Sequence, residues 1–221
     1  EMEKIHENTF RNVNIALANE MAIICDKMGI DVWEVIEAAK TKPYGFMPFY
    51  PGAGVGGHCI AVDPFYLTWK TREYGYHTKL IETAGEINNS MPEFVLDRTM
   101  KILNRFGKAL NGSKVLVLGA AYKPDINDVR ESPALKVIDL LVKNGAVLDY
   151  NDPYVQYFKY KGREYHSVTL NTEILQEADI VIITTAHSDY DYDFIQRNSK
   201  LIFDTKNAMK STTDKTNIEK L

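Results

Sequence analysis

The sequence predicts an α/β protein in which a helical segment precedes a doubly wound parallel sheet. Apolar residues recur at three- and four-residue steps through much of residues 1–107, which is the spacing of one face of a helix. After residue 112 the pattern changes, and short apolar runs alternate with helical segments. Such alternation is typical of parallel sheets whose strands are connected by helices. We therefore expect a helical domain over residues 1–107 and an α/β domain over residues 112–221.

Four helices are expected in the first domain. The first covers about residues 1–29 and ends at a glycine, and the second covers 31–40, with Asp31 as a candidate N-cap. Two more are expected over about 64–74 and 78–106. The apolar stripe of the first helix consists of Ile5, Val13, Ala16, Leu17, Met21, Ile24 and Met28.

An irregular segment separates the second and third helices. Residues 41–64 hold five glycines and four prolines, a composition that excludes a continuous helix or a central strand. The same segment is rich in tyrosine, phenylalanine and methionine. These side chains indicate a loop that packs around something rather than a solvated linker.

The second domain is expected to begin with a buried strand over residues 114–119. A helix follows, with Ser132 as its N-cap, Pro133 in its first turn and Gly145 just past its end. Another helix is expected over about 172–177. Further strands are expected over 146–150, 179–185 and 201–204.

Composition and charge argue against several classes of partner. The 221 residues are 45% hydrophobic and 25% charged, and the net charge is only −4. Because opposite charges are interspersed, nucleic acid is not expected as a partner. No run of about 18 apolar residues occurs, so no membrane-spanning helix is expected. The five histidines are scattered without ligand spacing, so no metal site is expected.

The cysteines and the first residues bear on the compartment and on the extent of the chain. Two cysteines, Cys25 and Cys59, favour a reduced, cytoplasmic protein over a disulfide-bonded one. The opening EMEKIHENTF is polar, unlike a signal peptide. Because the chain begins without methionine and inside a helical pattern, we expect it to be a processed or truncated piece.

Cys59 is the first candidate for chemistry, since it ends the glycine-rich run GVGGHC over residues 54–59. Glycines let a backbone approach a ligand, and a cysteine near the start of a helix has its thiolate favoured by exposed N–H groups. The alternative is an inert, buried cysteine beside a turn. Asp63, four residues on, can orient water or a charged partner, or can cap a helix that begins at Pro64. A base role for His58 is not favoured.

Polar groups elsewhere have both a functional and a structural interpretation. Lys4, Asn8 and Arg11 share one helix face, which by itself indicates only a solvated surface, and Cys25 is interpreted as a core residue. The sequence VLGAAYK places a turn just past a strand end, where open sheets bind ligands, yet it lacks the GxGxxG dinucleotide fingerprint. Three basic groups suit phosphate but also fit an ordinary charged surface: Lys123, Arg130 and Lys206.

Taken in order, these segments resemble the UDP-glucose/GDP-mannose dehydrogenase family over nearly the whole chain. PGAGVGGHCIAVDP (51–64) is similar to the family's catalytic-cysteine loop, and EKIHENTFRNVNIALANE (3–20) to its central helix. LGAAYKPDINDVRESPAL (118–135) resembles the opening of its UDP-binding domain. TKPYGFMPFYPG (41–52) is most similar to the members that oxidise UDP-N-acetylhexosamines. Members normally begin with a cofactor-binding Rossmann domain, which the 221 residues do not contain.

The resemblance implies a Rossmann-like UDP-binding domain and a four-electron oxidation of a sugar C6 alcohol to a carboxylate by two NAD⁺. It implies Cys59 as the nucleophile, through a thiohemiacetal and a thioester. Lys4 and Asn8 would stabilise charge on the C6 oxygen, and Asp63 would position water or hold Lys4.

The resemblance also assigns binding residues and a partner. Tyr122 and Lys123 match a nucleotide contact, and Arg130 matches an NAD contact. Lys206 stands where many members have Arg, and Lys42 lies near an Arg of the UDP-glucose enzymes; lysine lacks the bidentate geometry of arginine. The implied partner is a second copy, packed through the first helix. The loop implied to line the sugar and its nucleotide comprises Tyr50, Pro51, Gly52, Ala53, Gly54, Val55 and Gly56.

Two other classes of function remain open on the sequence. The chain by itself fits a UDP-sugar-binding module without turnover, because the dinucleotide fingerprint is missing. It also fits a dimerisation scaffold, because its first helix is long and carries an apolar stripe.

Overall fold

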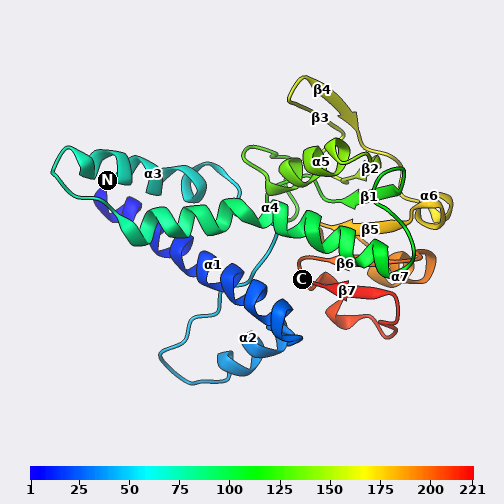
Figure 1. Ribbon diagram of the computed structural model, residues 1–221, viewed down its shortest axis with the longest axis horizontal. Helices are drawn as coiled ribbons and strands as arrows, with labels where there is room; N and C mark the ends of the chain where they lie inside the picture. The colour runs from blue at the N-terminus through cyan, green and yellow to red at the C-terminus, as the bar shows by residue number, and fades with distance from the viewer.

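Four helices form the first part of the chain in a computed structural model that describes all of residues 1–221 (Figure 1). They are α1 (Met2–Met28), α2 (Val32–Lys40), α3 (His58–Arg72) and α4 (Lys79–Arg105). α1 packs against both α3 and α4, and α2 lies beside the C-terminal end of α1. None of these helices, nor any other in the chain, combines the length and the apolar character needed to cross a bilayer.

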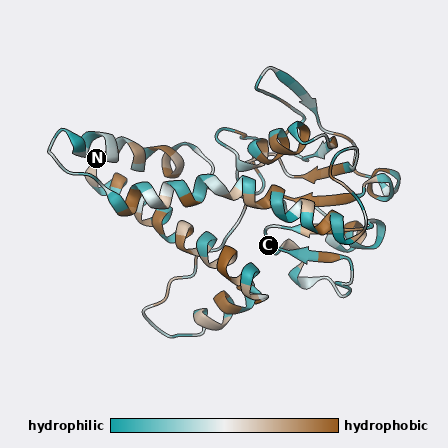
Figure 2. Cartoon of the chain, in the orientation of Figure 1, coloured by the Kyte–Doolittle hydropathy of each residue, from teal (hydrophilic) through white to brown (hydrophobic).

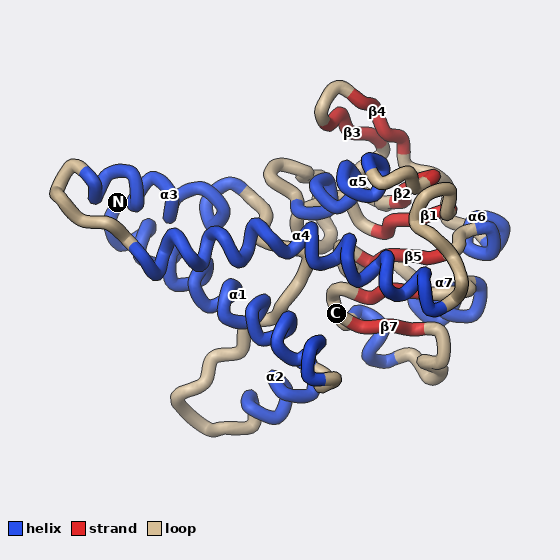
Figure 3. Tube along the Cα trace, in the orientation of Figure 1, coloured by secondary structure: helices blue, strands red, loops and turns tan.

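A five-stranded parallel sheet forms the second part, with strand order β2-β1-β5-β6-β7 (Figure 3). From β1 the chain first crosses to β2 on one side and later enters β5 on the other, which makes the sheet doubly wound and confirms the predicted fold class. The bounds of the strands are β1 Lys114–Leu118, β2 Val147–Asn151, β5 Ile180–Ile183, β6 Ile202–Asp204 and β7 Ile218–Lys220. The connecting helices are α5 (Pro133–Lys143), α6 (Thr172–Glu177), α7 (Tyr192–Asn198) and a 3₁₀ turn, η1 (Ala208–Ser211).

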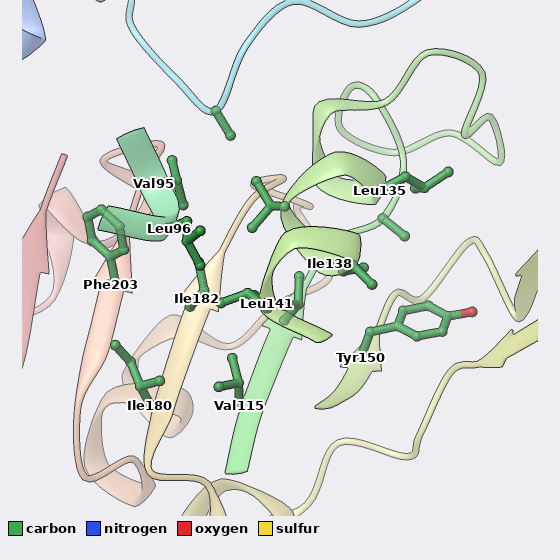
Figure 4. Packing of buried hydrophobic residues seen from close by; sticks show 14 of the residues in the cluster. Val95, Leu96, Val115, Leu135, Ile138, Leu141, Tyr150, Ile180, Ile182 and Phe203 are labelled. Atoms are coloured by element: carbon green, nitrogen blue, oxygen red, sulfur yellow. The ribbon is translucent and has the colours of Figure 1, made fainter. Parts of the chain in front are cut away.

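Both faces of the sheet are buried, because alternate strand residues face opposite ways. Val115 and Val117 of β1 pack with α4 and α5, whereas Leu116 and Leu118 pack with α6 and α7. The central strands are accordingly hydrophobic throughout (Figure 2). Figure 4 shows residues of α4, α5 and the sheet meeting in one cluster.

Helix α4 belongs to both parts of the chain. Ala84 and Asn88 lie among the helices, whereas Val95 and Leu103 are fully buried in the same cluster as the sheet strands. The division into 1–107 and 112–221 therefore stays a prediction, since one helix supplies core to both sides.

Several expectations for individual elements were incomplete or wrong, and helix α7 was not expected from the sequence. Helix α3 begins at His58 rather than at Pro64, so Pro64 lies inside the helix and Asp63 cannot be its N-cap. The edge strand β7 was not expected, and neither was the hairpin of β3 (Tyr157–Tyr160) and β4 (Arg163–His166). The hairpin turns at Lys161 and Gly162, which both have positive φ, 47° and 79°.

Candidate active site

Cys59 lies in the first turn of α3, immediately after the glycine-rich loop. Gly57 precedes the helix with φ +81°, a conformation that favours glycine, and redirects the chain into it. The Cys59 side chain is exposed and forms no disulfide, whereas Cys25 is buried on α1. Of the two thiols, only Cys59 is exposed, so the alternative in which Cys59 is buried is wrong. The reactivity of Cys59 stays a prediction.

Three asparagines on the buried face of α1 hold the segment that carries Cys59. Asn8 Nδ2 donates to Asp63 Oδ2 at 2.7 Å, and Asn12 Nδ2 donates to the carbonyl of Ile60 at 3.0 Å. Asn19 Oδ1 accepts the N–H of Gly52 at 3.0 Å. The two segments run in opposite directions, so Asn8 binds residue 63, Asn12 binds residue 60 and Asn19 binds residue 52. Helix α1 therefore fixes residues 52–63 at both ends.

A fourth asparagine, Asn88 of α4, closes this network. Its Oδ1 accepts from Asn19 Nδ2 at 2.9 Å, and its Nδ2 donates to the Asn12 carbonyl at 3.0 Å. Sequence reasoning missed Asn12, Asn19 and Asn88. The signal was present in part, because spacings of four and seven residues put Asn8, Asn12 and Asn19 on one helix face.

The structure joins Asn8 to Asp63 but does not bring Lys4 to that carboxylate. Lys4 is exposed, and its ammonium lies 3.3 Å from Glu7, one turn along α1. The expected Asp63–Lys4 contact is therefore absent, because the nearer carboxylate of Glu7 takes the lysine. Asp63 stands one turn after Cys59, so the two side chains share a face of α3.

The glycines of the loop let it approach the sheet domain closely. A Cβ on Gly56 would lie 2.7 Å from Tyr122 Cβ and 2.8 Å from Pro133 Cδ. The N–H of Gly57 donates to the Arg130 carbonyl at 3.3 Å. The cysteine loop thus rests directly on the segment that follows β1, and Tyr122 lies at this joint.

Lys206, which follows β6, reaches the same joint. Its amine occupies the space where a side chain on Gly52 would lie, and no carboxylate lies within 4.0 Å of it to form an ion pair. Burial lowers the pKa of Lys206, and the nearby Asp204 acts in the opposite direction. Because the amine has no acidic ion-pair partner, an anionic ligand would not have to displace one.

The loop after β1 presents two further cations. Lys123 is exposed, with its amine 5.7 Å from the centre of the Tyr122 ring. Arg130 is exposed and pairs with Asp128 at 2.7 Å, and this hydrogen bond from Arg130 holds the pKa of the Asp128 carboxyl below its usual range. Lys123 is thus without an acidic partner, whereas Arg130 already has one.

Tyr50, the first residue of the predicted sugar-binding loop, contacts α2. Its ring stacks on Trp33 of α2, with centroids 6.1 Å apart, and its hydroxyl donates to Glu37 at 2.9 Å. The neighbouring residues Pro51, Gly52 and Ala53 are buried at the joint. The structure therefore directs Tyr50 to α2 rather than to the joint between the cysteine loop and the sheet domain.

Asp152 and His187, both fully buried, fix the loop after β1. Asp152 accepts the N–H groups of Ala120 and Ala121, at 2.7 and 3.0 Å, and His187 Nε2 lies 3.0 Å from its Oδ2. His187 Nδ1 accepts the N–H of Asp125, so the ring proton is on Nε2. Burial opposes ionisation of Asp152, but hydrogen bonds from His187 and from backbone N–H groups lower its pKa.

The candidate site therefore lies where the cysteine loop meets the carboxyl ends of β1 and β6, which is the edge where doubly wound sheets bind ligands. Residues 1–90 match the family model for the central domain of the UDP-glucose/GDP-mannose dehydrogenase family. Residues 116–211 match the model for its UDP binding domain. The chain belongs to this family.

Relatives and solved structures agree with this assignment. The chain is 39% identical to UDP-N-acetyl-D-mannosamine dehydrogenase of Methanococcus maripaludis over 217 residues, which cover 95% of this chain and 48% of that protein. It superimposes on UDP-N-acetyl-mannosamine dehydrogenase Cap5O from Staphylococcus aureus with a TM-score of 0.81 at 39% identity, covering 100% of this chain and 50% of the other. For UDP-D-ManNAc dehydrogenase from Pyrococcus horikoshii the TM-score is 0.84 at 33% identity, covering 100% and 51%. The chain spans about half the length of these relatives.

Proposed function

We propose that the chain is the nucleophile-bearing and sugar-nucleotide-binding portion of an NAD-dependent UDP-N-acetylhexosamine 6-dehydrogenase. One observation carries this proposal: the loop that ends at Cys59 rests on the ligand-binding edge of a doubly wound sheet, with Tyr122 and Lys206 at the joint. A ligand that spans this joint would place its nucleotide on the sheet and its sugar near the thiol. The relatives that are named for UDP-N-acetyl-D-mannosamine support the choice of sugar.

The two lysines at the joint suit the diphosphate of such a ligand. Lys123 and Lys206 form no ion pair, so binding a diphosphate breaks no existing salt bridge. Loop residues 51–56, of which 51–53 are buried and 54–56 are half-buried, would then face the sugar and the adjoining nucleotide. Tyr50 would contribute only after leaving Trp33 and Glu37.

The proposed chemistry uses Cys59 in the second of two oxidations. The C6 alcohol first loses a proton and a hydride to become an aldehyde. The Cys59 thiolate then forms a C–S bond to the aldehyde carbon, and the resulting thiohemiacetal loses its hydroxyl proton and a second hydride to give a thioester. Water breaks the C–S bond and releases the carboxylate and the thiol.

Asn8, Lys4 and Asp63 would serve the oxygen atoms in these steps. The Asn8 amide is held by Asp63, which orients one of its N–H groups, and its second N–H would donate to a C6 oxyanion. Lys4 would join it by exchanging Glu7 for the oxyanion. The second oxygen of Asp63 would orient the hydrolytic water.

A nicotinamide cofactor would accept the hydride in each oxidation. The residues of this chain alone do not fit a complete dinucleotide site, because the loop after β1 is not a GxGxxG loop and Arg130 is already paired with Asp128. The Arg130 carbonyl accepts the N–H of Gly57, which places Arg130 next to the cysteine loop. Arg130 would therefore contribute one positive charge to the cofactor site. No further step is assigned to NAD contacts in this chain.

We also propose a homodimer through α1. Several apolar side chains of α1 are exposed, including Leu17 at 57% and Met28 at 66%. Leu17 also lines an apolar hollow of about 710 Å³ between α1, α2 and residues 45–49. An exposed apolar surface of this kind is typical of a protein interface. Residues that line the hollow include Phe10, Leu17, Met21, Val35, Phe46 and Met47.

The two free thiols agree with a reducing compartment, so we assign the protein to the cytoplasm.

A UDP-sugar-binding module without turnover is the second candidate for the 221-residue chain. The missing GxGxxG loop favours it.

Calorimetric titration of a panel of UDP-sugars into the chain tests the proposed function. We expect Lys206→Ala and Lys123→Ala each to weaken binding about tenfold, because each removes a charge-assisted contact to phosphate. Lys159→Ala, which removes an exposed lysine from the β3–β4 hairpin, is the charge-matched control and should bind as the wild type does. If no UDP-sugar binds, or if the control loses as much affinity as the two variants, the proposal is wrong.

A further inference from the structure

Pro64 leaves one carbonyl of α3 without its helical donor. In an α-helix the N–H of residue i+4 donates to the carbonyl of residue i, and proline has no N–H. Pro64 lies four residues after Ile60, inside α3. The Ile60 carbonyl, next to Cys59, therefore cannot receive the regular helical hydrogen bond.

Asn12 of α1 supplies the missing donor. Its Nδ2 lies 3.0 Å from the Ile60 carbonyl oxygen, and the residue is only 2% exposed. Its Oδ1 is buried and has no hydrogen-bond partner. A leucine would fill the same space without an unsatisfied acceptor, so the useful group of Asn12 is its N–H.

The position of Asn12 is itself fixed by its neighbours. Its backbone carbonyl accepts from Asn88 of α4, which also holds Asn19. One turn earlier on α1, Asn8 binds Asp63 of α3. The Asn12 amide that donates to Ile60 is therefore held in place by a network of hydrogen bonds between buried asparagines.

We infer that Asn12 is a positioning residue for Cys59. It replaces the hydrogen bond that Pro64 removes, and so holds the first turn of α3 in register with Asn8 and Lys4. This inference rests on the proposed role of Cys59 as the nucleophile. It also gives Pro64 a function, because a regular helix would bind this carbonyl internally and would need no contact from α1.

The test measures the rate at which iodoacetamide alkylates Cys59 at fixed pH, in the 221-residue chain. Asn12→Leu should slow alkylation about threefold, which is the loss expected when a thiolate no longer sits at an ordered helix N-terminus. Pro64→Ala restores an N–H for Ile60, so the double variant Asn12→Leu/Pro64→Ala should regain the wild-type rate. The matched control is Asn14→Leu, because Asn14 lies on the same helix but binds only the Phe10 carbonyl.

The ¹³C chemical shift of the Ile60 carbonyl gives a second readout. It reports the hydrogen bond to this carbonyl and does not depend on the overall stability of the protein. It should move in Asn12→Leu and return in the double variant. If Asn12→Leu fails to fold while the double variant folds, the result supports the inference. Wild-type alkylation in Asn12→Leu, or no recovery in the double variant, overturns it.

Failure of the proposed function gives a different result. If Cys59→Ser in the whole enzyme leaves acid formation intact, Cys59 is not the nucleophile, and Asn12 has no nucleophile to position. If Cys59→Ser abolishes acid formation but the double variant Asn12→Leu/Pro64→Ala does not regain the wild-type alkylation rate, only the inference about Asn12 is wrong.

Discussion

Glycine is required at position 56 by contact rather than by backbone conformation. Its φ is not in the left-handed region, yet a Cβ there would meet Tyr122, Pro133 and the Glu131 carbonyl at 2.7, 2.8 and 3.0 Å. Values below 3.0 Å require the loop or the sheet domain to move. Because Gly56 has no Cβ, the loop that carries Cys59 can lie in close contact with Tyr122 and Pro133 of the sheet domain.

Gly56→Ala is expected to lower the free energy of unfolding by about 1–3 kcal/mol, the usual cost of overpacking. It should also weaken UDP-sugar binding, because the loop must retreat from Tyr122. Thermal unfolding and calorimetry measure the two effects. Gly45→Ala is the control: Gly45 has φ +78° and open space around it, so alanine there costs about 1–2 kcal/mol of backbone strain without changing binding. Unchanged stability and binding in Gly56→Ala would contradict a close contact between the cysteine loop and Tyr122.

Local sequence patterns predicted the elements whose signals lie within them. The apolar run of β1, and the Ser132 and Pro133 that begin α5, were enough to place both elements. The start of α3 was missed because Pro64 looks like a first-turn proline, and the donor that compensates for it comes from another helix. The β3–β4 hairpin was missed because its alternating tyrosines and charges give a weak apolar pattern.

The site divides in the same way. Cys59, Asn8 and Asp63 were predicted from motifs of the family, whereas Asn12, Asn88, Asp152 and His187 were not. Each of the missed residues acts through a partner far along the chain: Asn88 binds the Asn12 carbonyl, 76 residues away, and His187 binds Asp152, 35 residues away. Only the fold brings such pairs together.

Asp152 links the loop after β1 to the pH dependence of stability. Its pKa is lowered in the folded protein, so folding favours the ionised form. The stability it contributes is present above the unfolded pKa of about 3.9 and is lost as pH falls through the lower, folded value. Asp152→Asn is expected to be less stable than wild type at pH 7, and the difference should narrow below about pH 4.

Urea unfolding of both proteins between pH 3 and pH 7 measures this difference. Asp214→Asn is the control, because Asp214 is exposed at the surface and its pKa is lowered mainly by the N–H of Thr216. A gap between wild type and Asp152→Asn that stays constant over the whole range would show that the carboxylate charge is not what holds the loop.

At the scale of the whole molecule, α1 faces two ways. Its buried face carries small and polar residues, among them Asn8, Asn12 and Asn19, and binds the segment of Cys59. Leu17, Ile24 and Met28, which belong to the predicted apolar stripe, are exposed. The polar face thus contacts the segment that carries Cys59, and the exposed apolar face is the basis of the proposed dimer.

We expect the chain to be a dimer in solution, with the hollow beside α1 covered by a second copy. Leu17→Glu should shift the mass from dimer to monomer, because it places a charge in an apolar interface. Light scattering at tens of micromolar measures the mass. Arg11→Glu, an exposed change elsewhere on α1, should leave the dimer intact. A monomeric mass for the wild type would rule out this interface.

The last prediction separates binding from turnover. We expect the 221-residue chain to bind a UDP-sugar weakly and to show no NAD⁺-dependent oxidation. Binding should survive because Lys123, Lys206 and residues 51–56 all belong to this chain. Lys206 already contacts the loop at Gly52, and Lys123 lies beside Tyr122, which contacts the loop at Gly56. Affinity should be low because the site is open, and polar contacts remain exposed to water.

Oxidation should fail because hydride transfer requires the nicotinamide to be held about 3–3.5 Å from the donor carbon. Arg130, which is exposed and paired with Asp128, cannot hold it there alone. Spectrophotometric assay of NADH formation tests the chain, and the same assay on a chain of full family length is the positive control. In that longer chain, Cys59→Ser should stop acid formation. Steady NADH production by the 221 residues alone, free of longer enzyme, would show that they hold a complete cofactor site.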